Sequence, residues 1–422
     1  MRVSTRVLVA AVAVSMAACG SATNPDGGSG GGAGSTGGGV ASTGGGAATG
    51  GGSETGGGTA TGGGTATGGG TATGGGTATG GGTATGGGTA TGGGSGSDAG
   101  TDTPPTLNFT TSPVANLPSG VRYVDGLHYG PDAEQVMDVF LPTSSTPTPL
   151  VIFFHGGGFT GGSRDNAYTG GGNAIVQFTT AGIAYITADY RLLQNIGVET
   201  EGVRKCLGDA ALAVQFVRRW SSVFNLDPSR VAVYGSSAGA GTSLWLAFHD
   251  DLAKADAGTE IERQSTRVTA AAALSTQATY DVLRWAPDVY GPEYPALTND
   301  VLLSQLTLRG TIVRFYGLPA SHVADAGAIL TTLTNSTYAA YRADADMLAL
   351  MSPDDPPVFV QNAGANTAPG TANFDLLHHP RHAVTVRNSG YDAGVTVEAD
   401  IDAYNVMSTT NAVTFLIDQL TP

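Results

Sequence analysis

Apolar runs alternate with amphipathic stretches from about residue 107 to the end of the chain. PLVIFF, IAYITADY and RVAVYG read as buried strands, and NAIVQFTTAG and residues 201–223 between them have helical spacing. VTAAAAL, PPVFVQN and VTVEAD are further strand-like runs, and NAVTFLIDQL reads as a closing helix. VRYVDGLHY and QVMDVFLP, which come first, predict an antiparallel pair. Apolar strands separated by helices are typical of a mostly parallel sheet with helices on both faces.

The folded part is predicted to be one α/β domain over residues 106–422. Roughly 315 residues is large for a single core but fits a domain with an inserted cap. Between about residues 280 and 347 the strand pattern loosens, and prolines interrupt the segment. These are Pro287, Pro292, Pro295 and Pro319. We therefore expect a helical cap over one end of the sheet in this segment.

Residues 19–105 differ from the rest, because they consist almost entirely of Gly, Thr, Ala and Ser. GGGTAT occurs six times in succession between Gly56 and Thr91. So few large apolar side chains cannot offset the entropy of ordering, which predicts a disordered tether with an r.m.s. span of about 50 Å. The period of six also fits a stacked β-solenoid. The lack of large inward-facing side chains disfavours that alternative.

The first eighteen residues have the layout of a secretory signal. Arg2 and Arg6 precede a short apolar run, and small residues follow it up to Cys19. This pattern is typical of an export signal and not of a membrane span. MAAC resembles a bacterial lipobox, which implies acylation of Cys19 and a lipoprotein of the cell envelope, at the outer membrane or the cell surface. An ordinary signal peptide cleaved near Ala18 is the alternative.

The charge and the cysteine content exclude some classes of protein. A formal net charge of −15 offers no cationic cluster to neutralise phosphates, so nucleic acid is not an expected partner. Besides Cys19, the chain contains only Cys206, and a disulfide framework is therefore not expected. Cys206 lies in a predicted amphipathic helix and is expected to be a buried, unreactive side chain.

The stretch GSSAG at residues 235–239 predicts a nucleophilic serine. It follows a predicted buried strand and precedes a predicted helix, which is the context in which a G-x-S-x-G turn exposes its middle residue, Ser237. Gly235 and Gly239 permit a tight turn, and the N–H of Ala238 opens the helix beside the hydroxyl. The same five letters also occur by chance in chains rich in Gly and Ser, so the prediction depends on this context.

A second glycine-rich stretch, HGGGF at residues 155–159, follows the strand PLVIFF. Consecutive glycines leave backbone N–H groups accessible, and such donors stabilise the oxyanion of acyl transfer by about 3 kcal/mol each. Together with GSSAG about eighty residues later, ADYRL between them, MDVFLP before them and SPDDPPVFV after them, the chain resembles the HGGG-type esterases and lipases of the α/β-hydrolase superfamily, the group related to hormone-sensitive lipase.

The resemblance implies a function and a set of site residues. Ser237 would be the nucleophile, the N–H groups of Gly157, Gly158 and Ala238 would form the oxyanion hole, and His155 would orient its loop. The implied substrate is a carboxylic ester, either a small molecule or one linked to a polymer, and no cofactor or metal is implied.

The chain departs from this family at the catalytic base. The family's histidine follows the last strand, but no histidine follows VTVEAD here. NFDLLHHPRHA, after PPVFVQN, contains the last histidines of the chain, and of these we favour His379 as a relocated base, followed by His378. The orienting acid would be Asp375, or else Asp400 or Asp402 after the last strand.

Three other interpretations of this segment remain open. The base could be lost, which would leave a non-catalytic binding protein on a hydrolase fold. HHPRHA could simply begin a helix, with Pro380 in its first turn. A metal site is disfavoured, because His379 stands where the zinc motif needs Glu and Pro380 interrupts the helix.

Overall fold

The computed structural model describes residues 103–371 and 374–421, together with seven three-residue strands between Ala41 and Thr91. These residues belong to two units, Met1–Gly94 and Ser95–Pro422, each described by itself. The predicted signal peptide and Cys19 lie outside the described residues. No helix in the described part of the chain is both long and apolar enough to cross a bilayer.

The first unit contains short strands at the repeated triplets. They are β1 (Ala41–Thr43), β2 (Thr59–Thr61), β3 (Thr65–Thr67), β4 (Thr71–Thr73), β5 (Thr77–Thr79), β6 (Thr83–Thr85) and β7 (Thr89–Thr91). They form two parallel sheets, in the orders β1-β2-β4-β6 and β3-β5-β7. Thr59 pairs with Thr71, and Thr71 pairs with Thr83, so every second repeat is a neighbour. This parallel pairing is the one expected for the alternative of a stacked β-solenoid. Apart from residues 103–105, the other residues of the predicted tether lie outside the described residues.

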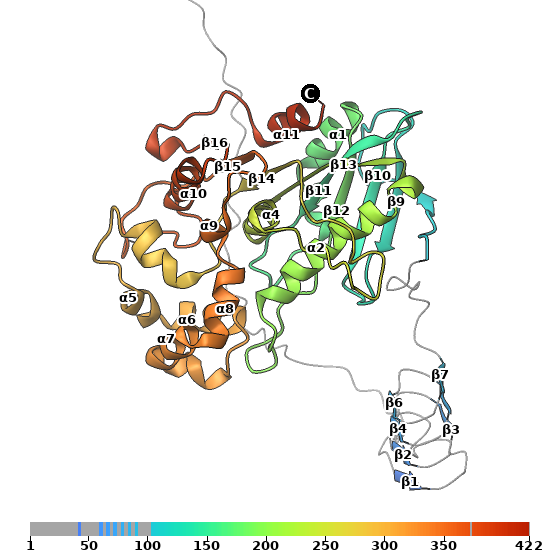
Figure 1. Ribbon diagram of the computed structural model, residues 1–422, viewed down its shortest axis with the longest axis horizontal. Helices are drawn as coiled ribbons and strands as arrows, with labels where there is room; N and C mark the ends of the chain where they lie inside the picture. The colour runs from blue at the N-terminus through green and yellow to red at the C-terminus, as the bar shows by residue number, and fades with distance from the viewer. Residues whose placement is uncertain are drawn as a thin grey trace, which may run out of the picture. The chain divides into compact units, whose positions relative to one another are not determined.

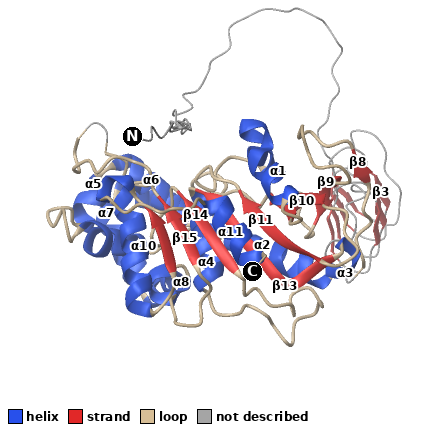
Figure 2. Cartoon of the chain, turned by 90° about the horizontal axis from the view of Figure 1, so that it is seen from above, coloured by secondary structure: helices blue, strands red, loops and turns tan. Residues whose placement is uncertain are grey.

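The second unit is built on a nine-stranded sheet in the order β16-β15-β14-β13-β11-β12-β10-β9-β8 (Figures 1 and 2). The strands are β8 (Phe109–Thr110), β9 (Arg122–His128), β10 (Val136–Leu141), β11 (Thr148–Phe154), β12 (Ala184–Ala188), β13 (Leu226–Ser236), β14 (Ala270–Leu274), β15 (Val358–Gln361) and β16 (Val397–Asp400). β8, β9, β10 and β12 are joined by antiparallel pairing. From β12 to β16 every pairing is parallel.

Alternating side chains on the central strands supply two separate cores. Leu150, Ile152 and Phe154 of β11 pack into one core, while Val151 and Phe153 pack into the other. The period of two follows from strand geometry, and a strand that is buried on both faces must be apolar throughout. This explains why PLVIFF shows no polar alternation.

Helices cover both faces of this sheet. The core of the first face includes residues of α2 (Val203–Arg219), α3 (Ser221–Phe224), α4 (Ala238–Phe248) and α10 (Pro380–Ala393). The core of the other face includes residues of α1 (Asn173–Thr180) and α11 (Ala412–Leu420). A 3-10 segment, η1 (Arg164–Gly172), leads into α1, and η5 (Asp402–Tyr404) follows β16. The fold class predicted from the sequence, a mostly parallel sheet with helices on both faces, is confirmed.

Between β14 and β15 the chain forms a helical cap, beside the sheet in Figure 1. Its elements are η2 (Val282–Arg284), the π-helical segment η3 (Trp285–Tyr290), α5 (Asn299–Ser304), α6 (Leu306–Phe315), η4 (Ala320–Ala324), α7 (Ala326–Thr334), α8 (Ser336–Asp344) and α9 (Met347–Leu350). Because this insertion starts at the carboxyl end of β14, it lies at the sheet edge where β13 also ends.

Candidate active site

The chain turns sharply at Ser237, between the end of β13 and the start of α4. Ser237 has φ 54° and ψ −117°, a left-handed backbone that a residue with a side chain rarely adopts. The flanking glycines are needed for close approach, since a β-carbon at Gly239 would lie 1.9 Å from the carbonyl oxygen of Phe154, and one at Gly235 would lie 2.5 Å from the same atom. The N–H of Ser237 donates to Leu274 O at 2.9 Å, which fixes the turn to the end of β14.

The glycine loop after β11 lies beside this serine. A β-carbon at Gly156 would come within 3.3 Å of Ser237 Cβ, so a side chain there would crowd the hydroxyl. Gly157 and Gly158 have φ of +114° and +60°. Within residues 103–371 and 374–421, no hydrogen bond from either N–H is recorded. The N–H of Ala238, at the first position of α4, has no intrahelical acceptor either. The loop and the helix thus bring donors without protein partners close to Ser237.

His155 begins this loop, and in the described part of the chain its ring makes its polar contacts with groups other than Ser237. Its ring is buried and stacks on Tyr190 with 4.3 Å between centroids. Nδ1 donates to Gly156 O at 2.7 Å, and the Tyr190 hydroxyl donates to His155 O, also at 2.7 Å. Burial lowers the pKa of the imidazole, so the ring stays neutral. The contacts of His155 thus lie within and beside the glycine loop, and its loop-orienting role stays a prediction.

His378 and Asp375 complete the arrangement. Ser237 Oγ lies 2.8 Å from His378 Nε2, and His378 Nδ1 lies 3.0 Å from Asp375 Oδ2. Asp375 Oδ1 also accepts from the N–H groups of Leu377 and His378 at 3.0 and 3.1 Å. Partial burial raises the pKa of Asp375, but the hydrogen bonds and charge of His378 outweigh it, and the pKa falls to about 2. With the carboxylate ionised, Nδ1 keeps its proton and Nε2 can accept from the serine hydroxyl.

His379, the base favoured on sequence grounds, lies elsewhere. It is the N-cap of α10, where Nδ1 accepts from Arg381 N at 3.1 Å and Nε2 donates to Thr367 O at 3.2 Å. The helix begins at Pro380, so His379 caps it while His378, one residue earlier, is turned toward Ser237. The expected order of the two candidates is therefore reversed, and His378 is the histidine at Ser237.

The third histidine of this segment, His382, is buried inside α10. Nδ1 accepts from Ala278 N at 3.0 Å, and Nε2 donates to Leu376 O at 2.9 Å. Burial lowers the pKa of His382 to about 3. The three rings thus have separate partners, and no group of three His, Cys, Asp or Glu side chains converges as a metal site in the described part of the chain.

The alternative acids after the last strand are not bonded to His378. Asp400 Oδ2 accepts from Gln361 Nε2 at 2.8 Å, and Asp402 lies in η5. Asp375 is therefore the carboxylate bonded to His378. It lies three residues before His378, so both side chains come from one loop after β15.

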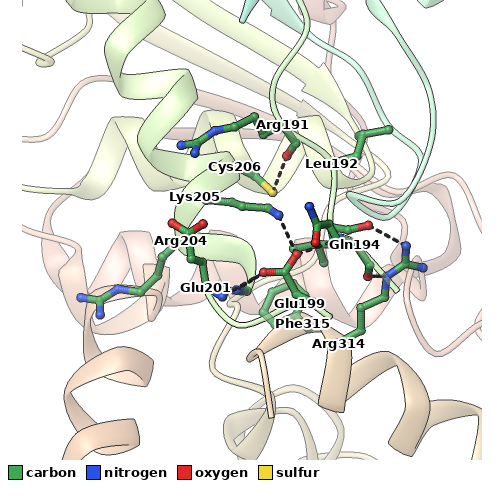
Figure 3. A network of polar contacts seen from close by, with 12 residues as sticks. Arg191, Leu192, Gln194, Glu199, Glu201, Arg204, Lys205, Cys206, Arg314 and Phe315 are labelled. Atoms are coloured by element: carbon green, nitrogen blue, oxygen red, sulfur yellow. Dashed lines mark hydrogen bonds and ion pairs between the residues drawn. The ribbon is translucent and has the colours of Figure 1, made fainter. Parts of the chain in front are cut away.

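The loop after β12 anchors the cap at the same edge of the sheet (Figure 3). Glu199 is buried and accepts from the N–H groups of Gln194, Glu201 and Gly202 and from Lys205 Nζ at 2.6 Å. The guanidinium of Arg314, from α6, donates to Leu193 O and Gln194 O. Cys206 donates to Arg191 O, and burial raises the pKa of its thiol, in agreement with an unreactive role.

The strand order, the strained serine turn at the end of β13 and the glycine loop after β11 are features of the α/β-hydrolase fold. Residues 137–309 match the BD-FAE family model, and this range includes both glycine motifs. The match confirms the resemblance to the esterase and lipase group.

Two relatives match part of this chain, and one solved structure aligns with most of it. A secreted lipase of Arthroderma benhamiae is 32% identical over 105 residues, covering 23% of this chain and 21% of the lipase. Carboxylesterase patB of Penicillium expansum is 29% identical over 174 residues, covering 39% of this chain and 27% of that enzyme. The chain therefore spans less than a third of the length of either relative. A truncated carbohydrate esterase from gut microbiota aligns at 16% identity and a TM-score of 0.45, covering 76% of this chain and 99% of that one.

Proposed function

We propose that this chain is a serine hydrolase that cleaves carboxylic esters through an acyl-enzyme. The observation that carries the proposal is the contact of 2.8 Å between Ser237 Oγ and His378 Nε2 at a strained strand-to-helix turn. A serine hydroxyl is a weak nucleophile unless a base is in hydrogen-bond reach. We assign this role to His378, because its Nε2 is within that reach of Ser237 Oγ.

In the first half of the reaction, Ser237 Oγ attacks the ester carbonyl carbon while its proton moves to His378 Nε2. The negative charge on the carbonyl oxygen is met by the N–H groups of Gly157, Gly158 and Ala238, each contributing about 3 kcal/mol to the transition state. His378 then protonates the leaving alcohol oxygen as the C–O bond breaks, and Ser237 remains acylated.

In the second half, His378 removes a proton from water, whose oxygen attacks the acyl carbon. The bond to Ser237 Oγ breaks, the serine recovers its proton from His378, and the carboxylic acid leaves. Asp375 keeps the imidazole in the tautomer with Nδ1 protonated and stabilises the imidazolium formed in each half. The sum is ester plus water giving acid plus alcohol. The substrate is either a small ester or an acyl group on a polymer.

The test is hydrolysis of p-nitrophenyl acetate and butyrate by the full-length protein. We expect turnover by the wild type, loss of at least 1,000-fold in kcat for Ser237→Ala and for His378→Ala, and at most a threefold change for His379→Ala. Equal turnover by wild type and Ser237→Ala would refute the proposal. Loss in His379→Ala but not in His378→Ala would refute the assignment of the base.

We further propose that the protein is an exported lipoprotein of the bacterial cell envelope, held at a membrane through acylated Cys19. The support is the signal-like start of the chain with MAAC before Gly20, and one relative is described as secreted. The low-complexity segment would then separate the hydrolase from the lipid surface.

A further inference from the structure

The segment that carries the proposed base is held by three side chains from elsewhere in the fold and by Asn362, its own first residue. Residues 362–379 form neither helix nor strand where they are described, so backbone pairing does not fix them. Instead, successive carbonyl groups from Leu376 to His379 accept from buried side chains. Leu376 O accepts from His382 at 2.9 Å and from the Tyr290 hydroxyl at 2.6 Å. Leu377 O accepts from Gln277 Nε2 at 2.9 Å. Asn362 Nδ2 lies 3.3 Å from His378 O and 3.2 Å from His379 O.

Asn362 is the member of this set that touches the backbone of the base itself. It follows β15 directly and has no exposed surface. Its Oδ1 accepts from Thr276 N at 2.9 Å, and its Nδ2 donates to Thr276 O at 3.0 Å as well as to the two histidine carbonyls. One amide orientation suits all four contacts: the N–H of Thr276 faces Oδ1, and the two hydrogens of Nδ2 are shared among three carbonyl oxygens.

These contacts connect the base to the strand that supports the nucleophile. Thr276 comes two residues after the end of β14, where Leu274 O accepts from Ser237 N at 2.9 Å. Asn362 therefore bridges the loop next to Ser237 and the backbone of His378. A misplacement of about 1 Å between reacting groups can cost a hundredfold in rate, so a base on an irregular loop needs such a bridge.

We infer that Asn362 is a positioning residue that sets His378 within hydrogen-bond distance of Ser237. The inference rests on the proposed function, since it assumes that His378 is the base. It requires a donor at Nδ2: an acceptor placed there would face three carbonyl oxygens and push the His378 backbone away. Asp375 accepts from the N–H of His378, and Asn362 donates to the carbonyl oxygen of His378. The backbone groups on both sides of the His378 Cα are therefore bonded.

The test is Asn362→Asp in the full-length protein, because this change keeps the shape and replaces the donor by a carboxylate oxygen. At pH 8 we expect kcat on p-nitrophenyl butyrate to fall about a hundredfold while KM changes less than about threefold. Burial beside carbonyl oxygens should raise the pKa of the introduced carboxyl group far above that of a free aspartate. Its protonation restores one donor, so the ratio of variant to wild-type kcat should rise as the pH falls from 8 to 6. A general loss of stability would not recover in that direction.

The matched control is Asn411→Asp, which makes the same chemical change at the N-cap of α11, where Asp serves equally well. Its kcat should stay within about twofold of the wild type. A second readout is independent of turnover. In crystals, the distance from Ser237 Oγ to His378 Nε2 should stay below 3.2 Å in the control and exceed 3.5 Å in Asn362→Asp.

The two readouts separate the inference from the proposed function. If the wild type hydrolyses esters and Asn362→Asp keeps its kcat within threefold at pH 8, the inference is overturned and the proposed function stands. If the wild type hydrolyses no ester, the proposed function fails and the distance alone decides the positioning role: an unchanged distance in Asn362→Asp overturns it.

Discussion

Replacing His382 by glutamine should make the stability of the protein less sensitive to acid. His382 is fully buried, its pKa is lowered to about 3, and its neutral ring joins Ala278 N to Leu376 O in the loop that carries the base. Glutamine does not titrate in this range, and its amide offers one acceptor and one donor, so the variant should still fold. The difference between the two proteins then isolates the titration of one side chain.

The magnitude follows from the two pKa values. In the unfolded chain a histidine titrates near pH 6.5. Above that pH, His382 is neutral in both the folded and the unfolded state, and its contribution to the free energy of unfolding does not change with pH. Below pH 6.5 His382 becomes protonated in the unfolded state, whereas in the folded state it stays neutral down to about pH 3. Stability is therefore lost as the pH falls, by about 1.4 kcal/mol per pH unit, or about 2 kcal/mol between pH 7 and pH 5.

The assay is urea unfolding of wild type and His382→Gln at pH 7 and pH 5, followed by tryptophan fluorescence and circular dichroism. Trp285 lies 5.3 Å from the His382 ring, so fluorescence reports on this region, and the two probes should coincide. His155 and His379, whose pKa values burial also lowers, are common to both proteins and cancel in the difference. We expect the wild type to lose about 2 kcal/mol more than the variant. Equal losses would refute the reasoning.

Two further predictions concern parts of the chain outside the catalytic contacts. Glu199→Gln should lower the free energy of unfolding by about 3 kcal/mol, because it leaves the buried Lys205 ammonium without its counter-charge. Adding Lys205→Met to this variant should recover at least half of that loss. A loss below about 1 kcal/mol in urea unfolding would mean that the pair behaves like a surface ion pair. In bacterial cells, radiolabelled palmitate should be incorporated into the full-length wild type and not into Cys19→Ala, and label that persists in the variant would refute lipidation at that residue.

The parts of the site that depend on local sequence could be predicted. GSSAG after a buried strand defines the turn at Ser237, because the two glycines and the strand-to-helix change are neighbours in the chain. HGGGF is likewise local, since the left-handed backbone at Gly157 and Gly158 needs glycine or nearly so. Asp375 could be chosen as a candidate because it is the only carboxylate in NFDLLHHPRHA.

The choice between His378 and His379 could not be made from sequence. The two residues are adjacent, and the start of α10 at Pro380 decides which ring points to Ser237 and which caps the helix. The one local sign is that His379 precedes Pro380, since a polar residue before a proline at the first helical position is a good N-cap, but this sign does not show which ring reaches Ser237.

The side chains that hold the base could not be predicted from local patterns. Asn362 and Gln277 reach Leu377, His378 and His379 only through the folded chain, across 16 to 100 residues of sequence. A polar residue just after a buried strand was the one available sign for Asn362. That sign alone does not distinguish a turn residue from one that supports a catalytic loop.

The most direct measurement of the central claim is the rate and position of fluorophosphonate labelling in full-length wild type, His378→Ala and His379→Ala. The account predicts a single adduct on Ser237 by mass spectrometry, formed at similar rates in wild type and His379→Ala and at least 1,000-fold more slowly in His378→Ala. An adduct on another residue, or a His378→Ala protein labelled as fast as the wild type, would contradict it.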